Sequence, residues 1–138
     1  MFTWNDYLSL AERLATLPEE EYKRTAISRA YYAAFCSASA WYLKRWKKLP
    51  KPRNPKEHLG SHEIVWAAYQ LPRHAKDRRY GKVGSLGDSL KQLRVYADYK
   101  ESFPMVDLLT LDDQVQIALR LARLLVKNLN GIESGRSR

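Results

Sequence analysis

The feature that most constrains this chain is the stretch 19–47, which contains neither glycine nor proline. Acidic residues open it and basic residues close it, an arrangement that complements the helix dipole. The stretch predicts one helix roughly 40 Å long, enough to cross a small domain from end to end. Its middle is rich in alanine, so neighbouring helices can approach closely while aromatic side chains fill the remaining gaps. We therefore expect an all-α bundle with this helix at its centre.

Four further segments show helical spacing on either side of the central helix. They cover about residues 3–14, 62–71, 88–101 and 110–131. Thr3 and Thr110 stand where N-caps are expected, and Ser61 is the expected cap of the segment that starts at His62. Gly131 is expected to end the last segment, whose apolar residues form a clear stripe. No segment is convincing as a strand, so about five helices are predicted.

Residues 73–87 interrupt this pattern. The segment is basic and contains three glycines, so we expect a mobile loop there. With 138 residues, the chain suits one domain with a single core. The prediction is therefore one helical domain over residues 1–131, followed by a disordered tail over residues 132–138.

The net charge of the chain is +9, and the excess is concentrated in two segments. Residues 44–56 hold seven basic residues and no acidic one, and residues 73–82 hold five basic residues beside Asp77. Such clusters attract phosphate backbones in a salt-dependent way, although a solvated loop surface would have the same composition. The candidate nucleic-acid contacts are Arg29, Lys47, Lys48, Lys51, Arg53, Arg73, Lys76, Arg78, Arg79 and Lys82.

The sequence lacks the patterns of several other classes of protein. No stretch approaches the apolar length of a membrane span, and the N-terminus has no basic region before an apolar run. The single cysteine, Cys36, cannot form an internal disulfide, which favours a cytoplasmic location. His58 and His62 stand four residues apart, but Gly60 lies between them and no third ligand has a motif spacing. We therefore expect no metal, no cofactor and no membrane contact.

Three short blocks of the sequence resemble the HEPN superfamily, small helical domains of prokaryotes and higher eukaryotes. The first block is similar to a branch that reads S-R-Y/A-Y-Y-A-x-F, and the third is similar to the L-R-x-x-A-D-Y of that branch. Between them, this branch has a histidine at the start of its third helix. The blocks here are Ser28-Arg29-Ala30-Tyr31-Tyr32-Ala33-Ala34-Phe35, then His62, then Leu93-Arg94-Val95-Tyr96-Ala97-Asp98-Tyr99. With these blocks in the right order, the resemblance covers the chain from about residue 5 to about residue 130.

The resemblance implies an antiparallel helical bundle, usually a homodimer, in a prokaryotic defence or toxin–antitoxin setting. In nuclease members an arginine is followed after four to six residues by a histidine, and two copies meet at a cleft that cuts RNA without metal. Arg94 matches the arginine, but Tyr99 stands where the histidine would be. His62 is a further candidate catalytic residue. The residues with a structural role would be Tyr31, Tyr32, Phe35 and Asp98.

Helix geometry limits what Arg94 and Tyr99 can do together. On an unbroken helix Tyr99 points about 140° away from Arg94, whereas Asp98 lies one turn above it. An ion pair between Arg94 and Asp98 is therefore an alternative to a phosphate contact.

Two functions remain open. One is a domain without catalysis that binds RNA or a nucleotide, or docks onto a nucleotidyltransferase or another defence partner. The other is a metal-independent ribonuclease that acts through Arg94 and Tyr99. The missing histidine favours the first, because tyrosine is a poor base at neutral pH.

Overall fold

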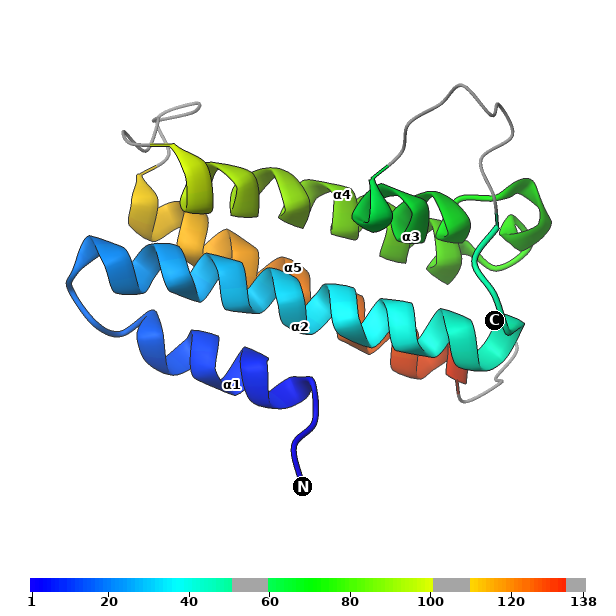
Figure 1. Ribbon diagram of the computed structural model, residues 1–138, viewed down its shortest axis with the longest axis horizontal. Helices are drawn as coiled ribbons and strands as arrows, with labels where there is room; N and C mark the ends of the chain where they lie inside the picture. The colour runs from blue at the N-terminus through cyan, green and yellow to red at the C-terminus, as the bar shows by residue number, and fades with distance from the viewer. Residues whose placement is uncertain (51–59, 101–109, 134–138) are drawn as a thin grey trace.

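The computed structural model describes residues 1–50, 60–100 and 110–133 (Figure 1). These residues form five α-helices and one short 3-10 helix, and no strand occurs among them. The elements are α1 (Asn5–Leu14), α2 (Glu20–Trp46), α3 (Ser61–Tyr69), η1 (Pro72–His74), α4 (Arg78–Tyr99) and α5 (Leu111–Glu133). The prediction of an all-α chain of about five helices is therefore confirmed.

The long helix α2 organises the bundle, as its composition predicts. Helices α1, α4 and α5 pack along it, and α3 packs on α4. In Figure 1, α1, α2 and α4 lie one above another on the side turned to the viewer, with α5 behind them. Alanines of α2 lie at the points of closest packing and are completely buried: Ala26, Ala30, Ala33, Ala34 and Ala38. Their small side chains let three helices approach α2 closely.

Side-chain caps form at the start of α4 and α5, whereas α1, whose N-cap is Trp4 and not the expected Thr3, has no side-chain cap hydrogen bond, and neither have α2 and α3. At α5, Thr110 Oγ1 accepts a hydrogen bond from the Asp113 backbone N–H at 3.2 Å, and Asp113 Oδ2 accepts one from the Thr110 backbone N–H at 3.0 Å. This reciprocal pair forms a capping box. At α1 only half of such a box forms, because the Thr3 backbone N–H donates to Asp6 but no side-chain cap is made.

Two further expected helix ends are wrong. Ser61 is the first residue of α3 and not its cap; the preceding Gly60 takes the cap position, and its N–H donates to Glu63 Oε2 at 3.1 Å. Helix α5 continues past Gly131 to Glu133, because Ile132 still packs into the core. The expected disordered tail at 132–138 therefore begins with two helical residues, and residues 134–138 lie outside the described part of the chain.

The prediction of a mobile loop at 73–87 is wrong. Pro72–His74 forms η1, and α4 begins at Arg78 after Asp77, whose carboxylate accepts the Arg79 backbone N–H at 3.0 Å. Gly84 and Gly87 lie inside this helix and are buried. A Cβ at Gly84 would lie 2.9 Å from the Trp66 carbonyl oxygen, and one at Gly87 would overlap the Trp66 ring. These glycines serve close packing of α3 on α4, which the sequence pattern does not reveal.

No helix among the described residues is long and apolar enough to cross a membrane. Three positions named from the sequence, Lys51, Arg53 and His58, lie outside the described ranges.

Candidate functional site

The first and third sequence blocks meet where α4 packs on α2. Arg94 of α4 is a buried charged residue, only 8% exposed. Its guanidinium carbon lies 5.3 Å from the ring centre of Tyr31, 5.6 Å from that of Tyr32 and 5.7 Å from that of Tyr99. Distances of this size are typical of cation–π contacts. Tertiary packing thus places the arginine among three tyrosines.

The guanidinium of Arg94 has few polar partners. Its Nη1 lies 3.5 Å from Asp98 Oδ2, so the expected ion pair is present. Asp98 Oδ2 also accepts a hydrogen bond from Ser28 Oγ at 3.3 Å, which joins the two blocks. Arg94 Nε is buried and has no hydrogen-bond partner among the described residues. Burial acts to lower the pKa of Arg94, but Tyr32, Tyr99 and Asp98 outweigh it and raise the pKa, so the group stays charged.

Tyr99 lies closer to Arg94 than helix geometry predicts. The expectation was that the two side chains diverge by about 140°. The arginine side chain is long enough to bring its head group to the Tyr99 ring, although the two residues leave the helix in different directions. Tyr99 is the last residue of α4 and is 71% exposed. Arg94 therefore reaches from the core to a ring at the surface.

His62 joins this cluster from α3. Its ring stacks on Phe35 with 3.9 Å between ring centres, and its Nδ1 lies 2.7 Å from the Tyr31 hydroxyl. Burial lowers the pKa of His62, and the positive charges of Arg94 and Lys91 lower it further. His62 is therefore neutral at pH 7.

The direction of hydrogen bonding through this cluster follows from Trp66. An indole N–H can only donate, and Trp66 Nε1 donates to the Tyr31 hydroxyl oxygen at 3.2 Å. Burial raises the pKa of Tyr31 to about 12, so its hydroxyl keeps the proton and donates it to His62 Nδ1. From this network we assign the His62 tautomer that carries its proton on Nε2. His62 thus keeps its Nε2–H as a donor, while its lone pair on Nδ1 is already in use.

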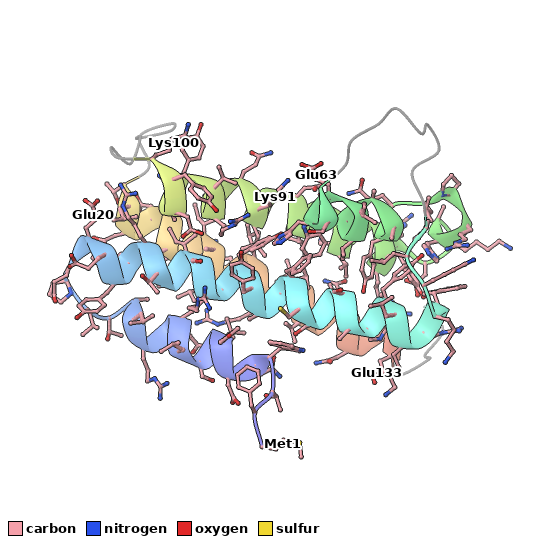
Figure 2. The ribbon with its side chains drawn as sticks, in the orientation of Figure 1. Met1, Glu20, Glu63, Lys91, Lys100 and Glu133 are labelled. Atoms are coloured by element: carbon pink, nitrogen blue, oxygen red, sulfur yellow. The ribbon has the colours of Figure 1, made fainter. Side chains whose placement is uncertain are left out.

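Sequence reasoning missed two residues that support this cluster. Trp66 sets the hydrogen-bond direction, and a lone tryptophan in a short helical segment gives no signal of that role. Lys91 forms an ion pair with Glu63, with Nζ 2.6 Å from Oε1, and so ties α4 to the start of α3 beside His62. Figure 2 shows Lys91 of α4 and Glu63 of α3 where these two helices meet. The only sequence signal for Lys91 was its positive charge three positions before Arg94.

The predicted basic clusters lie at a different place from Arg94. Helix α2 ends and α4 begins at the same end of the bundle (Figure 1), and Arg45 and Arg73 both lie over Trp46 there. The predicted nucleic-acid contacts that are exposed at this end of the bundle, called the basic end below, are Lys47, Lys48, Arg73, Lys76, Arg78 and Lys82. Along α4, Arg78 and Arg94 are about 24 Å apart at 1.5 Å per residue.

Arg79 and Arg29 differ from the other predicted nucleic-acid contacts. Arg79 forms an ion pair with Asp77 at 2.7 Å and donates to the Gly131 carbonyl oxygen at 2.6 Å, so it ties α4 to α5. Arg29 lies on α2 between Tyr7 and Tyr32 and does not belong to the basic end.

No group of three His, Cys, Asp or Glu side chains suited to a metal occurs among residues 1–50, 60–100 and 110–133. Comparison with family models, with curated proteins and with solved structures finds no match for this chain.

Proposed function

We propose that this chain is a HEPN-like domain that binds RNA, with a phosphate held at Arg94, and that it does so without cutting the strand. The setting expected from the resemblance is prokaryotic defence or a toxin–antitoxin pair. A bound nucleotide would offer the same phosphate chemistry. One observation carries the proposal: Arg94 is a buried guanidinium whose Nε has no hydrogen-bond partner among the described residues.

The surroundings of Arg94 suit a phosphate better than a purely structural role. A guanidinium fork matches two oxygens of a phosphate, and hydrogen bonds to an ionised partner are stronger than neutral ones. Asp98 uses only one edge of the fork, at a long 3.5 Å. The Nε2–H of neutral His62 and the hydroxyl of exposed Tyr99 are further donors near the arginine.

The same cluster lacks a base for cleavage. A general base must accept a proton from the 2′-hydroxyl, and it works best with a pKa near the working pH. His62 Nδ1 already accepts the proton of Tyr31, and no carboxylate among the described residues pairs with His62. The geometry therefore supports binding in preference to catalysis.

Direct titration tests the proposal. A labelled single strand of about 12 nucleotides, within the usual range of single-strand site sizes, should bind the purified protein in a fluorescence anisotropy experiment. Affinity should fall steeply between about 50 and 200 mM salt because phosphate contacts release counterions. Absence of binding at about 50 mM salt would reject the proposal.

Two charge-reversal variants test whether the basic end contacts RNA directly or acts only through net charge. In Arg78→Glu/Lys82→Glu, which changes two exposed residues of α4, the slope of log K against log salt should become shallower by about 0.7 per lost contact. Arg120→Glu/Lys127→Glu on α5 makes the same charge change at another exposed surface. Equal effects from the two variants would show that the basic end acts only through net charge.

Ribonuclease activity is the second candidate, because Tyr99 and His62 both lie around Arg94. We expect no cleavage of single-stranded RNA at pH 7, with or without EDTA. Cleavage that persists in EDTA and disappears in Arg94→Met would instead establish a metal-independent nuclease. The homodimer and the nucleotidyltransferase or other defence partner stay predictions from the resemblance.

A further inference from the structure

A row of arginine and aromatic side chains runs from α4 across α2 to α1 and the residues before it. It starts at the candidate phosphate site and ends at the N-terminus. Its members, in spatial order, are Arg94, Tyr32, Arg29, Tyr7, Trp4 and Phe2. They come from three separate helical segments and from the residues before α1, so only the tertiary structure aligns them.

Each neighbouring pair in the centre of the row is in contact. The Arg29 guanidinium carbon lies 5.1 Å from the Tyr32 ring centre and 5.0 Å from the Tyr7 ring centre. The Arg94 guanidinium carbon lies 5.6 Å from the centre of the same Tyr32 ring. No carboxylate forms an ion pair with Arg29 within the described ranges. Arg29 therefore resembles Arg94 in lying against tyrosine rings, although Arg94 also has Asp98 as an ion-pair partner.

The N-terminal end of the row is a cluster of exposed rings. Phe2 lies 5.2 Å from Trp4 and 5.3 Å from Tyr7, measured between ring centres. Phe2 remains 54% exposed and Trp4 39% exposed. Rings that only closed the core would be buried, so these offer flat apolar surface to solvent beside a cation.

We infer, on the basis of the proposed function, that this row is a binding track for single-stranded RNA: phosphates contact Arg94 and Arg29, and bases stack on Trp4 and Phe2. Single strands are bound in this way because unpaired bases stack on aromatic rings while cations follow the backbone. A duplex keeps its bases stacked inside and cannot use the rings. Arg94 and Arg29, the two cations of the row, supply the positive charge that a polyanion such as RNA needs along it.

The test compares strand lengths in two variants. Phe2→Ala/Trp4→Ala should weaken binding of a strand of about 12 nucleotides by at least about 25-fold, because two base stacks of about 1–3 kcal/mol each are lost. A strand of about four nucleotides, bound at Arg94 alone, should bind equally well to this variant and to wild type. Arg94→Met should weaken both strands. Tyr96→Ala, which removes a ring that is also partly exposed but lies outside the row, is the matched control.

The outcomes distinguish the binding track from the phosphate site at Arg94. If the long strand needs Arg94 but ignores the N-terminal rings, the track is wrong and the phosphate site stands. If neither Phe2→Ala/Trp4→Ala nor Arg94→Met affects binding, both the track and the phosphate site are wrong. Equal weakening of short and long strands by Phe2→Ala/Trp4→Ala would show an effect through the fold, and would also overturn the track.

Fluorescence gives a second readout that does not depend on stability. Of the four tryptophans, Trp4 alone is exposed, Trp41 and Trp46 are partly buried and Trp66 is completely buried, so Trp4 should give the largest share of the quenching by bound RNA. Trp4→Phe keeps an aromatic ring and should retain affinity within about twofold while much of the quenching disappears. Unchanged quenching in Trp4→Phe would contradict the track, as would a duplex that binds as tightly as the single strand.

Discussion

Replacing Arg94 by methionine should weaken RNA binding by about 10- to 100-fold and leave the bundle folded. The loss follows because hydrogen bonds to a charged group contribute about 1.5–3 kcal/mol. Methionine fills much of the same volume beneath Tyr31 and Tyr32, and a well-packed apolar residue can replace a buried charge with little loss of stability. Asp98 is not stranded by the change, since it keeps Ser28 and its side chain is 28% exposed. Anisotropy titration and thermal melting measure the two effects.

Arg94→Lys separates charge from shape at the same position. Lysine keeps the positive charge but loses the planar fork, so we expect binding between that of wild type and Arg94→Met. An Arg94→Met protein that melts near the wild-type temperature and binds RNA normally would show that Arg94 serves packing only. A collapse of stability in both variants, with Asp98→Ala equally damaged, would identify a structural ion pair as its main role.

Replacing Gly87 by alanine should destabilise the protein by about 1–3 kcal/mol, the usual range for an overpacked core. The added methyl would overlap the ring of Trp66, which is completely buried. A displaced ring would also weaken the bond from Trp66 Nε1 to the Tyr31 hydroxyl. Urea denaturation followed by circular dichroism gives the free energy of unfolding.

Gly81→Ala is the matched control in the same helix. Gly81 is exposed and a Cβ there would meet nothing within 4 Å, so the change should stabilise α4 by up to about 1 kcal/mol through helix propensity. The effect of Gly87→Ala should shrink in a Trp66→Leu background, because the two residues are coupled through direct contact. Similar effects from Gly81→Ala and Gly87→Ala in the wild-type background would refute the close approach of α3 and α4.

The local course of the chain is largely determined by the sequence. The run without glycine or proline predicts 19–47, and the structure has Glu20–Trp46. Thr110 is predicted as the cap of α5, and its hydroxyl does accept a hydrogen bond from the Asp113 backbone N–H. These signals work because a helix cap or an apolar stripe depends on residues within a few positions of one another.

The segment 73–87 shows where local reasoning fails. Three glycines and several basic residues are typical of a loop, yet Arg78 begins a helix that runs through all three glycines. Gly84 and Gly87 are needed because Trp66 from another helix occupies the space of a side chain. Intrinsic propensity is weak compared with such packing, and the sequence around the glycines contains no trace of the partner.

The same division holds for the candidate site. Arg94, Tyr99 and His62 could be named from the sequence blocks, and the ion pair of Arg94 with Asp98 follows from their spacing. Only the tertiary structure decided that Tyr31 links His62 to Trp66, and that Arg29 bridges two tyrosines instead of joining the basic end. Spacing along one helix determines neighbours within a turn. Contacts between helices depend on how side chains of different segments fill a shared volume, and a single sequence does not state that.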